Sequence, residues 1–168
     1  MLSAIVYNSA TGSCKKYAEL LSAKLHIPCH PLSDAYVRSD GQVLYISWVM
    51  AGKVVGYAKA AKKLNIAAVA AVGMGPVGPS SADAGRKANK VPDRVAYFCL
   101  QGGFNINKLS APMKLIMQWK VKDIAKRLQA KGSLNAQEQA TYKMATTGAG
   151  EPASWDISEI LAWCKANS

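Results

Sequence analysis

Small hydroxyl-bearing residues follow the first apolar run of the chain. That run ends at Tyr7, and Ser9, Thr11 and Ser13 then alternate with other small residues, directly before a helical pattern begins. Hydroxyl groups and the unpaired N–H groups of a helix N-terminus suit a phosphate, because both donate hydrogen bonds and the helix dipole favours negative charge. The sequence therefore predicts an anion cradle in which these three hydroxyls donate. A simple helix-capping cluster is the alternative interpretation.

A second glycine-rich stretch, Gly73-Met74-Gly75-Pro76-Val77-Gly78, follows a later apolar run. Its letters match the GxGxxG pattern of dinucleotide-binding loops. Two features disfavour a nicotinamide site. Pro76 and Pro79 lack the N–H groups that a pyrophosphate needs, and no acidic residue ends a strand about 20 residues later to bind a ribose.

These loops must be positioned by apolar runs of strand length that alternate with helical patterns, as in the βαβ units of a parallel sheet. Pro28 and Pro31 interrupt the second run, which places it at a sheet edge. The predicted strands span 4–7, 26–32, 43–49, 66–72 and 94–100. The predicted helices span 14–25, 54–64, 81–90, 105–131 and 155–165, the last with Ser154 as its N-cap. We expect an α/β fold, a doubly wound five-stranded parallel sheet with helices on both faces, whose ligand lies beyond the carboxyl ends of the strands.

The segment Tyr7-Asn8-Ser9-Ala10-Thr11-Gly12-Ser13-Cys14 resembles the signature of the flavodoxin-like family, in which a strand ends in [ST]-x-T-G-x-[ST] around the phosphate of flavin mononucleotide (FMN). Ser9, Thr11, Gly12 and Ser13 match, and Cys14 replaces the usual final hydroxyl residue. The resemblance covers nearly the whole chain. It implies one flavodoxin-like domain, residues 1–168, that binds FMN and carries out electron transfer.

The resemblance also assigns two loops to the flavin ring. In the family, the loop after the third strand touches the ring, often with an aromatic residue and a glycine, so Trp48 and Gly52 are the candidates. Trp48 as a core residue is the alternative. The loop after the next strand approaches the pyrimidine edge of the ring. The implied FMN-binding residues are Ser9, Ala10, Thr11, Gly12, Ser13, Cys14, Ser47, Trp48, Val49, Met50, Ala51, Gly52, Val72, Gly73, Met74 and Gly75.

The chain after the last strand is similar to the flavodoxin-like subfamily that includes menaquinone-dependent protoporphyrinogen oxidase. Lys114-Leu115-Ile116-Met117-Gln118 keeps most of an inserted Lys-Leu-Ile-Met-Lys-type helix, within a basic helical insertion at about residues 105–150. This similarity implies an alternative function, an FMN-dependent oxidoreductase that acts on an anionic substrate at a membrane surface.

Residues 105–131 carry much of the positive charge of the chain. They hold seven Lys and Arg against one acidic residue, Asp123, and so contribute six of the eleven net positive charges. An apolar stripe at helical spacing is expected to pack into the domain, whereas Trp119 falls off the stripe and is the candidate for a membrane or partner contact. The stripe consists of Met113, Ile116, Met117, Val121, Ile124, Ala125 and Leu128.

Composition restricts the remaining functions. Half of the 168 residues are hydrophobic and 18% are charged, as in one globular domain. The basic balance indicates redox partner proteins or a small anionic substrate, and the absence of nucleic-acid-binding motifs disfavours nucleic acid. The chain lacks a run of about 20 apolar residues and a signal peptide, so we expect a cytoplasmic protein with reduced cysteines. No metal site is predicted, and no catalytic side chain is assigned, because a flavin carries its own redox chemistry.

Overall fold

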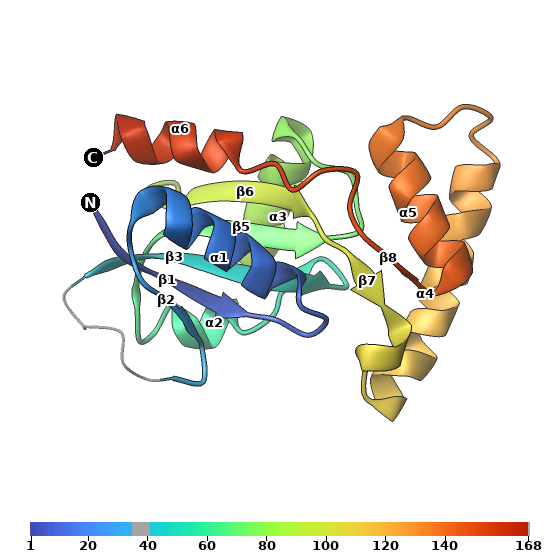
Figure 1. Ribbon diagram of the computed structural model, residues 1–168, viewed down its shortest axis with the longest axis horizontal. Helices are drawn as coiled ribbons and strands as arrows, with labels where there is room; N and C mark the ends of the chain where they lie inside the picture. The colour runs from blue at the N-terminus through green and yellow to red at the C-terminus, as the bar shows by residue number, and fades with distance from the viewer. Residues whose placement is uncertain (35–40, 168) are drawn as a thin grey trace.

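Five parallel strands form the centre of the computed structural model, which describes residues 1–34 and 41–167 (Figure 1). The strands are β1 (Leu2–Asn8), β2 (Cys29–Pro31), β3 (Gln42–Met50), β5 (Asn65–Gly73) and β6 (Ala96–Gln101). They lie in the order β2-β1-β3-β5-β6, which is the flavodoxin-like order when the parallel strands are counted along the chain. The predicted fold class is therefore confirmed, with the proline-interrupted strand β2 at an edge.

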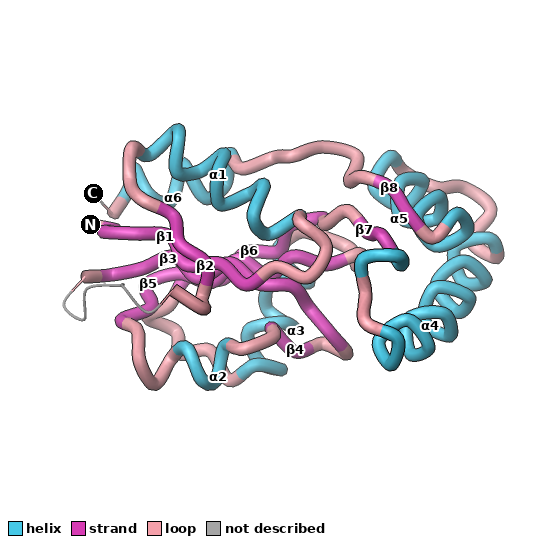
Figure 2. The backbone as a smooth tube through the Cα atoms, turned by 60° about the horizontal axis from the view of Figure 1, so that its bottom comes forward, coloured by secondary structure: helices cyan, strands magenta, loops and turns pink. Residues whose placement is uncertain are grey.

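Two helical layers cover the two faces of this sheet (Figure 2). Side chains alternate between the faces along each strand, so Ile5 packs under α1 (Ser13–Leu25) and α6 (Ser158–Ala166), while Val6 faces the other layer. That other layer contains α2 (Tyr57–Ala60) and α3 (Pro79–Asn89). The fully buried Leu21 and Ile160 belong to the first face, and the fully buried Tyr45 and Val69 belong to the second.

The predicted helix over 54–64 is wrong in most of its length. Val54 belongs to the short strand β4 (Lys53–Val54), which pairs antiparallel with the end of β3 through a two-residue turn. Both turn residues, Ala51 and Gly52, have positive φ angles of 50° and 78°, as a tight hairpin turn requires. The chain then passes Gly56, whose added Cβ would lie 2.7 Å from the Tyr45 hydroxyl oxygen, and only four residues form α2.

The last helix begins three residues later than predicted. Helix α6 starts at Ser158, and Ser154 does not cap it. The carboxylate of Asp156 accepts a hydrogen bond of 2.9 Å from the Ser158 N–H instead. This contact holds the pKa of the Asp156 carboxyl below its usual range, because the hydrogen bond favours the charged form.

The chain between β6 and α6 forms a helical appendage beside the carboxyl end of the sheet (Figure 1). It leaves through β7 (Phe104–Asn105) and returns through β8 (Ala149–Gly150), and these two strands pair antiparallel. Between them lie the short 3-10 helix η1 (Ile106–Lys108), α4 (Ala111–Gln129) and α5 (Ala136–Thr147). The single helix predicted over 105–131 is thus shorter.

Helix α5 was not among the predicted helices. It starts with a capping box in which Asn135 accepts from the Glu138 N–H and the Glu138 carboxylate accepts from the Asn135 N–H. Its Met144 is fully buried against Phe104 and Val121, so the appendage has a small core of its own.

Candidate functional site

A cavity lies at the carboxyl end of the sheet, between the start of α1 and the start of α4. Ten of the sixteen predicted FMN-binding residues line it, because three loops that are distant in sequence converge there. These residues are Ser9, Ala10, Thr11, Ser13, Cys14, Trp48, Val49, Val72, Gly73 and Met74. The appendage and the end of β6 supply the rest of the lining, which is Gly102, Gly103, Phe104, Leu109, Met113 and Met117.

The other six predicted residues lie outside this cavity. Gly12 lines an adjacent one, and Gly52 and Gly75 line a groove beside α3. Ser47 is fully buried and its hydroxyl donates to the Val55 carbonyl oxygen at 2.7 Å. Met50 and Ala51 belong to the end of β3 and its hairpin turn. The Gly52 carbonyl oxygen accepts a hydrogen bond of 3.0 Å from the Asn89 side chain, which holds this turn against α3.

The start of α1 presents backbone donors, but its hydroxyl groups are already engaged. No side chain caps this helix, whose N-cap Gly12 has a φ of 107°, and the Gly12 N–H donates to the Ser9 oxygen at 3.1 Å. The Ser13 hydroxyl donates to the Gly103 carbonyl oxygen at 3.0 Å, and the Thr11 hydroxyl donates to the same oxygen at 3.5 Å. The Thr11 and Ser13 hydroxyls thus donate within the protein, because the turn after β6 packs directly against the loop, whereas the Ser9 hydroxyl oxygen accepts. Donation from these three hydroxyls to a phosphate stays a prediction. The N–H groups of the first helical turn are the donors that suit an anion.

Cys14 contributes no charge to this helix start. Its side chain is 1% exposed, and burial raises the pKa of the thiol to about 12. The thiol is therefore neutral at physiological pH and does not repel an anion bound at the helix N-terminus.

Trp48 and two methionines define the apolar part of the cavity. Trp48 is half-buried, packs against the core under α1 as the alternative interpretation expects, and also lines the cavity. Its contact with a flavin ring stays a prediction. Met113 and Met117 of α4 line the same cavity from the appendage. The free volume of the whole cavity is about 80 Å³, whereas pockets that enclose small ligands usually hold about 300–1,000 Å³. The residue types suit a phosphate and an aromatic ring, and the cavity as it stands is smaller than such pockets.

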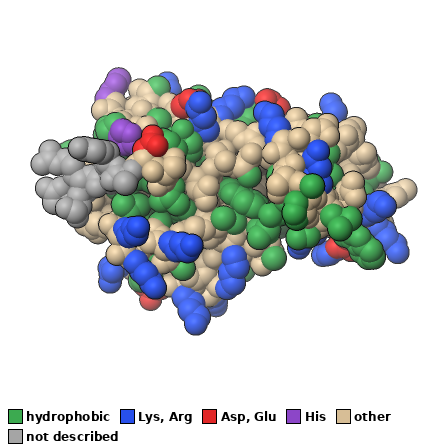
Figure 3. Space-filling view, turned by 90° about the horizontal axis from the view of Figure 1, so that it is seen from below, with side chains coloured by type: hydrophobic (Ala, Val, Ile, Leu, Met, Phe, Trp, Pro, Cys, Tyr) green, Lys and Arg blue, Asp and Glu red, His purple; other side chains and the backbone are tan. Residues whose placement is uncertain are grey.

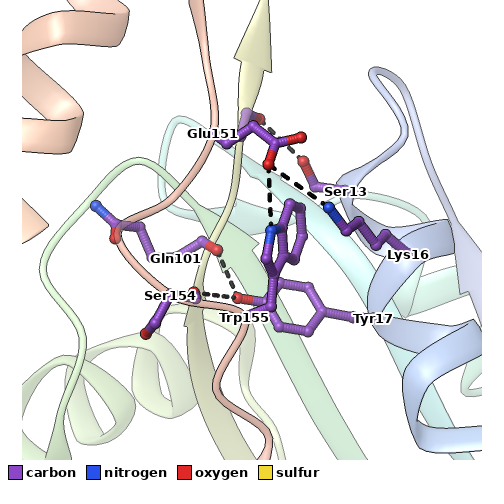
Figure 4. A network of polar contacts seen from close by, with 8 residues as sticks. Ser13, Lys16, Tyr17, Gln101, Glu151, Ser154 and Trp155 are labelled. Atoms are coloured by element: carbon purple, nitrogen blue, oxygen red, sulfur yellow. Dashed lines mark hydrogen bonds and ion pairs between the residues drawn. The ribbon is translucent and has the colours of Figure 1, made fainter.

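A cluster of polar contacts attaches the returning chain to α1 (Figure 4). Lys16 forms an ion pair of 3.6 Å with Glu151, and its ammonium nitrogen lies 4.0 Å from the ring centre of Trp155. The indole N–H of Trp155 donates to the same carboxylate at 3.4 Å. The Tyr17 hydroxyl donates to the Gln101 carbonyl oxygen at 2.7 Å, and burial raises the pKa of this phenol.

Gln101 connects the sheet with the appendage and was not singled out by its sequence pattern. Its side chain is buried and donates to the Gln137 carbonyl oxygen at 2.7 Å and to the Thr141 hydroxyl at 3.1 Å. Its side-chain oxygen accepts from the Ala153 N–H at 2.9 Å. Thr141 in turn donates to the Met74 carbonyl oxygen at 3.1 Å. A glutamine that ends an otherwise apolar strand is the signal in the sequence that marks this junction.

Helix α4 has a second, outward face. Most of the predicted apolar stripe packs inward, but Ile116 is 49% exposed, which corrects its assignment to the buried stripe. Leu115 and Trp119 are 63% and 79% exposed. We call these three residues the α4 patch. Seen from below, apolar side chains gather at the end of the molecule that α4 forms, with Lys and Arg side chains around them (Figure 3).

The chain matches no protein-family model, no curated protein and no solved structure. In the part of the chain that the structure describes, no helix has both the length and the apolar composition needed to cross a bilayer. No group of three or more His, Cys, Asp or Glu side chains suited to a metal ion occurs among the same residues.

Proposed function

We propose that this protein binds FMN and functions in electron transfer. The observation that supports this most is the convergence of three loops on one cavity at the carboxyl end of a sheet with the flavodoxin-like strand order. That edge is where open α/β sheets bind their ligands. The uncapped helix start next to Ser9 and Thr11 suits the phosphate group of FMN.

In this proposal the chain binds and orients the cofactor. The N–H groups at the start of α1 would hold the phosphate, and Trp48, Met74 and Met113 would contact the ring. When bound, FMN supplies one- and two-electron redox chemistry. The protein contributes an apolar slot and a net charge of +11, which favours a reduced, anionic cofactor and a higher potential. A basic surface also suits acidic redox partner proteins.

An adjacent cavity favours a second candidate, an FMN-dependent oxidoreductase that acts on an anionic substrate. This cavity of about 360 Å³ shares Thr11, Ser13, Gly103 and Phe104 with the first one. Its lining includes Lys108 and the ion pair between Lys16 and Glu151, so Lys108 is the ammonium group that this proposal relies on. Ammonium groups bind carboxylates, so a polycarboxylate could bind beside the FMN site. Citrate can serve as a calorimetric probe: binding that is lost in Lys108→Ala, with FMN affinity unchanged, would favour this enzyme. Absence of citrate binding would argue against it.

Titration with FMN tests the primary proposal. The purified protein should perturb the visible absorption bands of FMN and bind it at a stoichiometry of one. Thr11→Asp should abolish binding, because a carboxylate beside the phosphate repels it. Ser80→Asp adds the same charge to an exposed position of α3 and should leave binding unchanged. Wild-type protein that binds no FMN, or a Thr11→Asp variant with unchanged affinity, would contradict the proposal.

A further inference from the structure

The α4 patch is an unusual surface for this molecule. Five large apolar side chains are exposed among the described residues, and three of them, Leu115, Ile116 and Trp119, lie on adjacent turns of α4. Positions three and four residues apart share one side of a helix, so these side chains form a continuous apolar surface. Grouped apolar side chains on a surface mark a site of interaction, whereas isolated ones do not.

The inward side of the same helix packs against the rest of the appendage. Val121 is buried, and Met117 and Ile124 pack with it against Met144 of α5. The α4 patch therefore does not contribute to the core of the appendage. Helical spacing places it on the side of α4 opposite Met113 and Met117, which line the cavity. Helix α4 itself lies at the outer end of the molecule (Figures 1 and 2).

Positive charge continues along the outward side of α4. Lys122 and Lys126 follow Trp119 by three and seven residues, which places them in line with it, and Lys120 follows Ile116 by four. The helix has one acidic residue, Asp123, whose carboxylate forms an ion pair with Arg127. The outward face thus combines a compact apolar patch with exposed lysines, which complements a surface that is apolar below and anionic above.

We propose that α4 docks on an anionic lipid bilayer. The α4 patch enters the boundary between headgroups and acyl chains, with the Trp119 indole at headgroup depth, and the lysines contact the lipid phosphates. A lipid surface fits better than an acidic protein, because a row of flexible lysines beside a convex apolar patch matches a fluid layer of phosphates without requiring one fixed set of acceptors. Docking in this orientation places the lipid on the side of α4 opposite the cavity.

Vesicle flotation with flavin-free protein tests this proposal independently of FMN binding. The protein should float with vesicles of phosphatidylcholine containing about one-third phosphatidylglycerol, and it should bind vesicles of phosphatidylcholine alone about tenfold or more weakly. Raising the salt to 0.5 M should weaken binding, because the lysine contribution is screened. Tryptophan emission should shift to shorter wavelength on binding, and Trp119→Phe should remove most of that shift.

Matched variants distinguish a specific effect of the outward face of α4 from a general effect of positive charge. Lys122→Glu/Lys126→Glu should reduce partitioning by about tenfold or more, whereas Lys62→Glu/Lys63→Glu, the same charge change at exposed positions after α2, should have a much smaller effect. Leu115→Ser/Trp119→Ser should reduce partitioning, and Leu20→Ser, on exposed α1 surface, should not. Equal loss in both charge variants would overturn the proposal. Absence of binding to anionic vesicles would also overturn it and leave an acidic protein as the occupant of this face.

Discussion

Gly103 is the residue at which the anion loop, the end of the sheet and the appendage meet. Its carbonyl oxygen accepts from the Ser13 and Thr11 hydroxyls, and a Cβ added to it would lie 2.9 Å from the Gly150 carbonyl oxygen and 3.4 Å from the Ser13 hydroxyl oxygen. A side chain at this position would have to displace backbone. The loop that contains Thr11 and Ser13 can therefore lie close to Gly103 because this residue, which is distant in sequence, has no side chain.

Gly103→Ala should lower the free energy of unfolding by about 1–3 kcal/mol, because the new methyl group overpacks a backbone contact. Chemical denaturation measures this change. Gly75→Ala is the matched control, because a Cβ at Gly75 meets nothing within 4 Å, and its free energy should change little. Equal stability of the Gly103 variant and the wild type would show that β8 can move aside without cost.

A single carboxylate accepts a hydrogen bond from the first residue of the last helix. Asp156 accepts from the Ser158 N–H, and the hydrogen bond lowers its pKa. A group whose pKa is lowered in the folded state adds stability above its unfolded pKa and loses this contribution as the pH falls through its folded pKa. Asp156 therefore stabilises the fold at neutral pH and not in strong acid.

Asp156→Ala should lower the free energy of unfolding by about 1 kcal/mol at pH 7, because it removes the hydrogen bond from the Ser158 N–H to a charged carboxylate. The free energies of unfolding of the variant and the wild type should approach each other as the pH is lowered through the acidic range in which this carboxylate becomes protonated. Urea titrations at several pH values measure it, with Asp93→Ala, at an exposed residue, as the control. If the two free energies of unfolding differ by the same amount down to pH 2, the Asp156 carboxylate does not have this stabilising role.

At the scale of elements, one side of α4 lines the candidate site and the other side is exposed. Its first turns bring Met113 and Met117 to the cavity, where the free space is about 80 Å³. On the proposed function, we expect these side chains or the start of α4 to move outward when the flavin ring binds. On the proposed function, the appendage limits the rate at which the cofactor enters.

Met113→Ala/Met117→Ala should increase the association rate of FMN, because it enlarges the slot without altering the phosphate-binding loop. Stopped-flow mixing of FMN with flavin-free protein measures this rate. Leu115→Ala/Ile116→Ala removes two apolar side chains from the exposed face of the same helix and should leave the rate unchanged. An association rate that is the same for all three proteins would show that α4 does not limit entry.

At the scale of the whole molecule, two packed bodies are joined by a small number of buried polar contacts. The sheet with its two helical layers is one body, and the appendage with its core around Met144 is the other. Gln101 bonds to backbone or side-chain atoms of Gln137, Thr141 and Ala153 across this junction. Met74 of the sheet body also packs against the core of the appendage, so both polar and apolar contacts cross the junction.

Gln101→Leu should lower the free energy of unfolding by about 1–3 kcal/mol, because it removes the hydrogen bonds that this buried side chain makes with Gln137, Thr141 and Ala153. Hydrogen exchange should increase most in α5, whose Gln137 and Thr141 lose their contacts. Gln118→Leu, at an exposed position of α4, is the control and should change neither measurement. If hydrogen exchange is unchanged along the whole of α5, apolar packing alone holds the appendage against the sheet.

The sequence by itself determined the fold class, the edge position of β2 and the segments that meet at the carboxyl end of the sheet. These features depend on local periodicity, on proline positions and on the order of strands, all of which are written in consecutive residues. The capping box of α5 is equally local, so its helix could have been predicted from Asn135 and Glu138.

Only the tertiary structure decided which hydrogen-bonding and packing partners the loop residues have. Ser13 donates to Gly103, ninety residues away. Met113 lines a cavity to which loops much earlier in the sequence also contribute. Ile116 is exposed because the cluster around Met144 takes in Met117, Val121 and Ile124 but not Ile116, and helical spacing alone does not specify which residues of the stripe the neighbouring helix covers. Such contacts depend on how separate elements pack in space, and a pattern within one segment contains no information about the segment packed against it.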